Sequence, residues 1–178
     1  MIRMKRLFSV LAVLPFFAAC SEEVEEIFPQ YPNMVKNGSF EDLNLSVEFW
    51  DSSDEGEVVV TESDFYEGQR AMAILPSSCM EITYADSLPV ERDATYELSF
   101  ATKLTPLTDQ CLTDLFIYME QDNEVVLEVN VSASEGEGWK KRTTYLRAES
   151  SSPVYLYLFT GNATVLLDDV QFKRMQSF

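Results

Sequence analysis

Short segments of alternating apolar and polar residues, separated by turn residues, run through most of the chain, and no apolar pattern of helical period interrupts them. In one of them Tyr96, Leu98 and Phe100 share a face, which we expect to be buried. Strands are expected at Gly56–Thr61, Arg70–Leu75, Met80–Tyr84, Thr95–Leu104, Leu115–Gln121, Val125–Val131, Trp139–Arg147, Val154–Thr160 and Thr164–Lys173. Short strands at this spacing predict an all-β fold, a β-sandwich or jelly roll.

The first nineteen residues have the parts of a secretion signal. A basic start that ends at Arg6 is followed by the apolar run Leu7–Ala19. This run has thirteen residues, which fits the range of roughly 7–15 for a signal. A helix that spans a membrane needs about 20. We therefore expect residues 1–19 to be a signal peptide rather than a retained membrane helix.

Small residues precede Cys20 in the sequence Phe17-Ala18-Ala19-Cys20, which resembles the bacterial lipobox. In a lipobox the cysteine sulfur carries a diacylglyceryl group and the signal is cut before it. The resemblance implies that Cys20 is lipidated and that the lipid anchors the protein to the bacterial outer membrane. An ordinary signal peptide cut nearby explains the apolar run equally well and would leave Cys20 as a free thiol.

An acidic segment follows the cysteine, because Ser21–Glu26 contains four glutamates. We expect residues 20–32 to be an acidic tether. The segment resembles the surface-export signal of lipoproteins from one group of Gram-negative, glycan-degrading bacteria, which implies exposure at the cell surface. In the alternative interpretation it is only a solvated segment.

The charge of the chain excludes one class of partner. Removal of the signal takes away three basic residues and no acidic ones, so the mature chain has 10 basic and 30 acidic residues and a net charge of −20. Such a chain repels phosphate backbones, so nucleic acid is excluded as a partner. The chain also has no histidine, which removes catalytic triads and other acid–base chemistry that depend on one.

Four motifs occur in order along the chain. They are Asn37-Gly-Ser-Phe-Glu41 followed by Trp50, Tyr66-Glu-Gly-Gln-Arg-Ala71, Tyr96-Glu-Leu-Ser-Phe100 and Leu167-Asp-Asp-Val-Gln-Phe172. In this order they resemble the carbohydrate-binding modules of the galactose-binding-like jelly-roll superfamily, especially the xylanase-associated type. The resemblance covers residues 33 to 174 and implies a galactose-binding-like β-sandwich over residues 33–178. It further implies a polysaccharide or oligosaccharide as the partner.

The resemblance also implies a structural calcium ion, held by Glu41 and Asp168 of the first and last motifs. The last strand gives a separate reason, since Asp168 shares parity with apolar residues and is expected to be buried. A buried carboxylate needs a cation or several hydrogen-bond donors. Loops near Gly38 and Gly68 could supply the carbonyl oxygens that calcium prefers. In the alternative interpretation, Asp168 accepts backbone hydrogen bonds and Glu41 is exposed.

Aromatic residues that lie opposite an apolar face of their own strand are candidates for sugar stacking. Tyr118, Tyr145 and Tyr157 have this arrangement and are the ligand-binding candidates, and if they point outward they could form one platform. Packing of the same rings in the core is the alternative, and parity does not assign a strand to a sheet. Trp50 and Trp139 match positions that the family uses in the core.

Cys79 and Cys111 remain once Cys20 is lipidated, and an exported protein can oxidise such a pair. If strands 80–84, 95–104 and 115–121 alternate in direction, both cysteines lie at one end of the sandwich. We expect a disulfide, which would stabilise the fold by roughly 3–4 kcal/mol on the chain-entropy model. Two buried free thiols are the alternative.

The sequence thus predicts a membrane-anchored, surface-exposed module that binds or associates with glycans and is not an enzyme. One alternative is an adhesion or assembly subunit that uses the same sandwich to bind protein partners at the cell surface. A carboxylate-based glycoside hydrolase is less expected, because it needs two acids about 5–9.5 Å apart in a cleft. No sequence feature singles out such a pair.

We predict that a fatty-acid probe labels the wild-type protein in bacteria that process lipoproteins, because Cys20 follows a lipobox-like Ala-Ala pair. Cys20→Ser should abolish the label, whereas Cys79→Ser should keep it. Gel fluorescence of the labelled proteins measures both variants. Unchanged labelling of Cys20→Ser would contradict the lipid anchor.

Overall fold

The computed structural model describes residues 31–44, 47–52, 56–76, 79–106, 114–161 and 163–176. The chain divides into two units, Met1–Gln30 and Tyr31–Phe178, and the described residues all belong to the second. The predicted signal peptide, Cys20 and most of the predicted tether therefore lie outside the described residues. Within the described ranges, no helix has the length and apolar character needed to cross a membrane.

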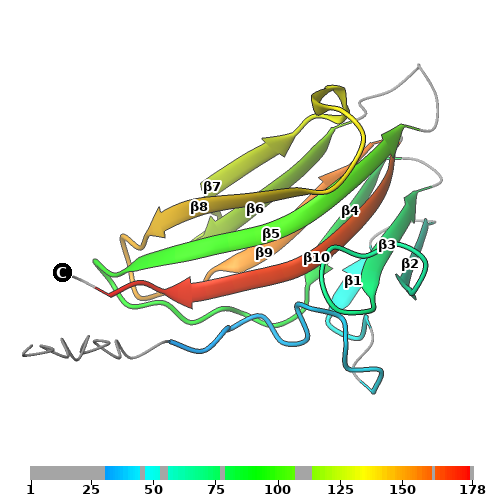
Figure 1. The fold of residues 1–178 in the computed structure, drawn as a ribbon. Coiled ribbons are helices and arrows are strands. Elements are labelled where there is room, and N and C mark those ends of the chain that lie inside the picture. Colours follow the sequence, from blue (N-terminus) through cyan, green and yellow to red (C-terminus); the bar gives the residue numbers. More distant parts are fainter. Residues whose placement is uncertain are drawn as a thin grey trace, which may run out of the picture. The chain divides into compact units, whose positions relative to one another are not determined.

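Two five-stranded antiparallel sheets form a sandwich (Figure 1). In chain order the strands are β1 (Trp50–Ser52), β2 (Gly56–Thr61), β3 (Ala71–Pro76), β4 (Met80–Tyr84), β5 (Thr95–Pro106), β6 (Leu115–Gln121), β7 (Glu124–Val131), β8 (Lys140–Arg147), β9 (Tyr155–Thr160) and β10 (Ala163–Arg174). Sheet A has the order β1-β4-β9-β6-β7, and sheet B has the order β2-β3-β10-β5-β8. A short 3-10 helix, η1 (Ala133–Glu135), lies between β7 and β8. The predicted all-β sandwich is confirmed.

Each of the nine strands expected from alternation is present, with its ends within two residues of the expected ones. The additional strand is β1, which has only three residues, too few to show an alternation. It forms because β4 offers an edge: Trp50 pairs with Tyr84 and Ser52 with Ile82. The nine longer strands could therefore be predicted from alternation, whereas β1 was too short to be predicted in this way.

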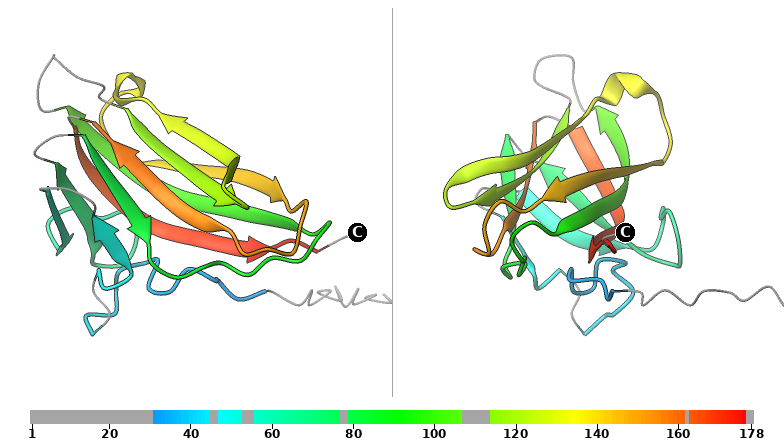
Figure 2. Two further views of the ribbon diagram at one scale, coloured as in Figure 1. Left: turned by 180° about the vertical axis from the view of Figure 1, so that it is seen from behind. Right: turned by 90° about the vertical axis from the view of Figure 1, so that its left-hand side faces the viewer.

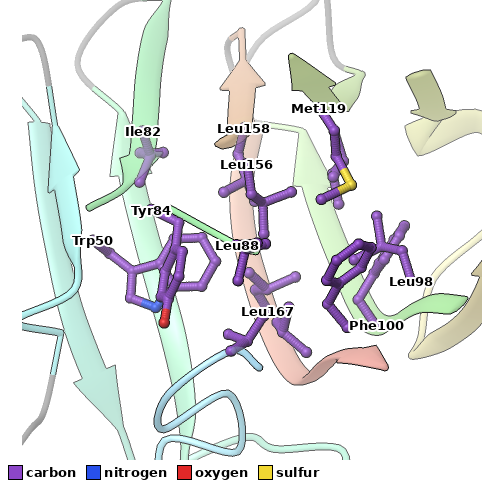
Figure 3. Close-up of a cluster of buried hydrophobic side chains, with 14 of the residues drawn as sticks. Trp50, Ile82, Tyr84, Leu88, Leu98, Phe100, Met119, Leu156, Leu158 and Leu167 are labelled. Atoms are coloured by element: carbon purple, nitrogen blue, oxygen red, sulfur yellow. The ribbon is translucent and has the colours of Figure 1, made fainter. Parts of the chain in front are cut away.

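The core lies between the two sheets and takes every second residue of their central strands. Figure 3 shows leucines of β9 and β10 packed with residues of β4, β5 and β6. Leu156 and Leu158 of β9 and Leu98, Phe100 and Leu167 of sheet B are each at most 1% exposed. Burial of a side chain of this size contributes about 1.5–3 kcal/mol. The predicted inward face of β5 is therefore confirmed.

Two buried tyrosines show how the core accommodates polar atoms. The Tyr96 ring stacks on Phe172 at 5.1 Å and 13°, and its hydroxyl accepts the backbone N–H of Glu91 at 2.8 Å. The Tyr84 hydroxyl likewise accepts a backbone N–H at 2.8 Å, and its ring lies 5.2 Å from Trp50. Burial raises the pKa of Tyr84. The expectation that Trp50 is a core residue is confirmed.

The strand order predicted for the two cysteines also agrees with the structure as far as it is described. Thr160 of β9 pairs with both Met80 and Leu115. Cys79 is exposed and directly precedes β4, so it lies at the same end of the sandwich as the start of β6. Cys111 lies outside the described residues, so the disulfide stays a prediction.

We predict that Leu156→Ala lowers the free energy of unfolding by about 2–5 kcal/mol, the usual cost of a large-to-small change in a core. Tyr155→Ala, one residue earlier on the outer face, should cost less than about 1 kcal/mol, as is usual for surface changes. Urea unfolding of both variants beside the wild type measures the difference. Equal losses would contradict the orientation of β9.

Candidate functional site

The outer face of sheet A carries a contiguous set of aromatic side chains, which we call the platform. Its members come from the neighbouring strands β6 and β9 and are Phe116, Tyr118, Tyr155, Tyr157 and Phe159. The residues between them on both strands are buried. Figure 2 shows β9 (orange) beside β4 and β6 in the middle of this sheet. Alternation therefore turns the aromatic residues away from the core.

Strand register brings the platform residues together in rows. Tyr118 lies opposite Tyr157, and Phe116 lies opposite Phe159. The tyrosine rings stack, with centroids 5.0 Å apart and planes at 14°, whereas the phenylalanine centroids are 6.5 Å apart and tilted by 54°. Tyr155 lies in the next row, opposite Glu120. The predicted outward orientation of Tyr118 and Tyr157 is confirmed.

Carboxylates border the platform and interact with its tyrosines. The Tyr118 hydroxyl donates to Glu81 Oε2 at 2.5 Å. Burial, followed by this hydrogen bond, raises the pKa of Tyr118, and burial followed by the charges of Glu120 and Glu81 raises the pKa of Tyr157. Both tyrosines are therefore protonated at neutral pH, and Tyr157 has a hydroxyl that can donate to a ligand.

An open hollow with a volume of about 440 Å³ lies at one end of the platform. Its lining residues are Glu120, Asp122, Asn123, Ser152, Pro153, Tyr155 and Tyr157. Ligand sites in proteins commonly have volumes of about 300–1,000 Å³ and combine aromatic rings with a few polar groups. The hollow and the platform share Tyr155 and Tyr157, so one extended ligand could contact both.

Tyr145 does not belong to the platform, so the prediction of a single surface for the three tyrosines was wrong. It lies on β8 in sheet B, opposite Glu97 of β5, and is 57% exposed. Its outward orientation followed from alternation, but its sheet depends on a pairing that alternation does not encode. The Tyr145 ring can therefore serve as a control for the platform.

The expectation that Trp139 is a core residue was also wrong. Its ring is partly exposed, lies outside the buried cluster and contacts the exposed Tyr66 ring at 6.0 Å. Its indole N–H donates to Asp64 Oδ1 at 2.8 Å, and Lys103 donates to the other oxygen of the same carboxylate at 2.6 Å. These polar groups satisfy one another within the protein.

Asp168 lies beneath the segment that precedes β3, and it is 1% exposed. Its Oδ2 accepts the backbone N–H groups of Tyr66 and Glu67, each at 3.0 Å, and its Oδ1 accepts the N–H of Asp169 at 2.7 Å. Burial is the main cause that raises the pKa of Asp168, and these hydrogen bonds lower the pKa in part. The predicted burial is confirmed.

Glu41 holds the next part of the same segment. Its Oε1 accepts the backbone N–H groups of Gln69 at 2.7 Å and Arg70 at 3.0 Å. Gly68 directly precedes Gln69 in this segment and has a φ of +75°. A Cβ atom at Gly68 would lie only 2.2 Å from Glu41 Oε1. The structure therefore brings Glu41, Gly68 and Asp168 to one turn, as the motifs predicted.

Gly38 has a steric role of the same kind. A Cβ atom at Gly38 would meet the carbonyl oxygen of Val170 at 2.0 Å. The Gly38 carbonyl in turn accepts the N–H of Val170 at 2.8 Å. The first motif thus packs directly against β10, and only glycine leaves the space for this contact.

No family model matches the sequence, and no curated protein does. Solved structures match over most of the described domain. The CBM22-1 xylan-binding domain from Paenibacillus barcinonensis is 17% identical, with a TM-score of 0.55 over 79% of this chain and 94% of that one. A family 16 carbohydrate-binding module is 16% identical, with a TM-score of 0.58 over 79% and 99%. The family 61 module TmCBM61, solved with β-1,4-galactotriose, is 15% identical, with a TM-score of 0.55 over 82% and 99%.

The chain has the fold of a carbohydrate-binding module. These three neighbours are carbohydrate-binding modules of the galactose-binding-like jelly-roll type, so the resemblance seen in the four motifs is confirmed for the fold. At these identities the comparison concerns the fold alone, and any function must be argued from the residues of this chain.

The residues around Glu41 and Asp168 fit a calcium ion in part. Each carboxylate uses one oxygen for two N–H donors, and the remaining oxygens have spare capacity: Asp168 Oδ1 accepts one N–H, and Glu41 Oε2 lies 3.7 Å from Arg70 Nη1. Among the described residues, no group of three or more acidic, histidine or cysteine side chains could hold a metal. Backbone carbonyls would have to complete the six to eight oxygen ligands that calcium takes.

The raised pKa of Asp168 gives the direction of its effect on stability. The folded module holds the proton more tightly than the unfolded chain, so the contribution of Asp168 is present below the ordinary pKa of 3.8 and is lost as the pH rises through the folded value. At neutral pH the buried charge therefore costs stability. A bound cation would offset this cost, so calcium stays a prediction.

We predict that a chelator lowers the melting temperature, because an ion that binds only the folded state stabilises it by about 2.7 kcal/mol at a hundredfold excess over Kd. Asp168→Ala should remove the response. Glu41→Gln keeps an acceptor for Gln69 and Arg70 but loses the charge, so it should weaken the response. Thermal unfolding with and without chelator measures all three proteins. A wild type whose melting temperature does not change with the chelator would contradict the calcium site.

Proposed function

We propose that this protein is a non-catalytic glycan-binding module and that the platform on sheet A is its binding surface. The observation that carries the proposal is the row in which Tyr118 and Tyr157 stack side by side, flanked by Phe116 and Phe159. Rings arranged in this way on a sheet face offer apolar area to the C–H faces of sugar rings.

The polar groups at the platform suit the hydroxyl groups of a sugar. Carboxylates such as Glu120 accept hydrogen bonds, and the Tyr157 hydroxyl can donate one. Tyr118 already donates to Glu81, which fixes its ring before a ligand arrives. A few placed polar groups beside a mainly apolar surface are typical of ligand sites. The neighbours described as xylan-binding or solved with a galactotriose support a glycan as the ligand class.

The proposal assigns binding rather than hydrolysis to the platform, because stacking and hydrogen bonding need no acid–base pair. With no histidine in the chain, acid–base chemistry at this face would depend on carboxylates. Glu81 already accepts the Tyr118 hydroxyl, so it lies in a position suited to holding the ring. We infer that the lipid on Cys20 and the acidic tether would display this surface outside the bacterial outer membrane.

A protein-binding role has one observation in its favour. β7 is one of the two edge strands of sheet A, and its Val125 is 54% exposed. Open edges can pair with a strand of another chain. This surface is separate from the centre of the platform, so a protein partner at the edge and a glycan on the platform are compatible.

We predict that Tyr157→Ala weakens glycan binding at least about tenfold, or ~1.4 kcal/mol, because it removes half of the stacked pair. Tyr118→Ala should have a similar effect, and Tyr145→Ala on sheet B should have none. A glycan array of the domain, followed by calorimetric titration of the best oligosaccharide, measures binding. Thermal unfolding of each variant verifies the fold.

Two results would contradict the proposal. Normal binding by folded Tyr118→Ala and Tyr157→Ala would place the ligand elsewhere. Loss of binding in Tyr145→Ala alone would move the site to sheet B. A soluble domain from residue 28 onward serves for these titrations, since it leaves out the signal and lipid anchor.

A further inference from the structure

Charge is divided unequally between the two sheets. The five strands of sheet A contain no lysine or arginine, and their acidic residues are Asp51, Glu81, Glu120, Glu124 and Glu128. The strands of sheet B contain seven basic residues, which are Lys103, Lys140, Lys141, Arg142, Arg147, Lys173 and Arg174. The lack of lysine and arginine in the strands of sheet A therefore does not simply follow from the acidic composition of the chain. Most basic residues of the mature chain lie on the other sheet.

The register places these carboxylates around the platform. Glu81 lies opposite Phe159, and Glu120 lies opposite Tyr155. Glu128 lies opposite Tyr118 on the edge strand β7. The hollow at the end of the platform adds a further carboxylate from the turn after β6. A sugar stacked on the tyrosines would thus have a carboxylate on several sides.

Lys36, in the segment before β1, has a carboxylate partner outside the platform. Lys36 lies 5.1 Å from the Phe49 ring and pairs with Asp86 at 2.6 Å, so its charge is already matched. The negative surroundings are also felt by the tyrosines, since the charges of Glu81 and Glu120 both contribute to the raised pKa values of Tyr118 and Tyr157.

We propose that the platform selects glycans built from unacetylated amino sugars, whose protonated amines carry positive charge. The inference rests on the proposed glycan-binding function and names its substrate class. An ammonium group beside a stacked sugar would meet carboxylates and tyrosine ring faces, both of which attract cations. Glycans that contain uronic acid or sulfate would be repelled by the same groups. Neutral glycans would stack but would leave the charge of the face unmatched.

A matched series of ligands tests this selection. Cellohexaose, its glucosamine counterpart and its N-acetylglucosamine counterpart share one backbone and differ only in a hydroxyl, an amine or an acetamide on each ring. We expect the glucosamine hexamer to bind the wild type at least about tenfold more tightly than either neutral hexamer at low salt. The preference should fall in about 0.5 M salt, because screening then acts over only a few ångström.

Variants that remove one carboxylate charge each test which residues cause the preference for the amine-bearing hexamer. Glu81→Gln and Glu120→Gln should each reduce, several-fold, the ratio of glucosamine-hexamer affinity to cellohexaose affinity measured in the same variant. Glu57→Gln, an exposed position on β2 of sheet B, is the matched control and should keep the preference. Calorimetric titration of each protein with the three hexamers gives the comparison.

The other outcomes would overturn either the selection of amino sugars or the proposed glycan-binding function, and they distinguish between the two. Equal binding of the three hexamers, or tighter binding of a neutral one, overturns the selection and leaves the glycan-binding proposal standing. A preference that persists in Glu81→Gln and Glu120→Gln but falls in Glu57→Gln assigns the effect to the overall charge and also overturns it. Failure of every array glycan to bind the folded domain overturns the proposed function itself.

Discussion

The contact between the buried side of β9 and sheet B determines which side chains face solvent on sheet A. With Leu156 and Leu158 in the core, alternation leaves Tyr155, Tyr157 and Phe159 only the outer face. A shift of one residue would bury three large rings and expose the leucines. Pairing with β4 on one side and β6 on the other holds β9 against such a shift. The platform is therefore a consequence of how the core is filled.

Alternation was sufficient to predict the strands. It left two orientations open for Tyr157, because leucines form one face of β9 and aromatic rings form the other, and packing against sheet B decides between them. It was not sufficient for Tyr145, whose sheet depends on the pairing of β8 with β5, segments far apart in the sequence. The family resemblance was not sufficient for Trp139, which precedes β8 and contacts a loop residue rather than the core. Local period predicts orientation, whereas long-range pairing decides which outward residues become neighbours.

Asp168 is buried as predicted, but the physical reason differs from the one on which the prediction was based. Parity grouped it with Val170 and Phe172, but Leu167 lies in the core, and the register shifts between Asp168 and Gln171. This β-bulge contains one extra residue of β10, which returns Val170 and Phe172 to the core after Asp168. The carboxylate is instead buried beneath the turn that donates its N–H groups. A bulge depends on the partner strand, so the sequence of β10 alone could not reveal it.

Aromatic rings that face solvent cost free energy, because part of their apolar surface stays in contact with water. Tyrosine reduces this cost because its hydroxyl remains solvated or hydrogen-bonded. Stacking on Tyr157 and the hydrogen bond to Glu81 restrict the Tyr118 ring in advance, so less side-chain entropy is lost on binding. The same carboxylate adds negative charge beside the rings. Under the proposed function, this one contact would both order the stacking surface and bias the charge of the ligands that it accepts.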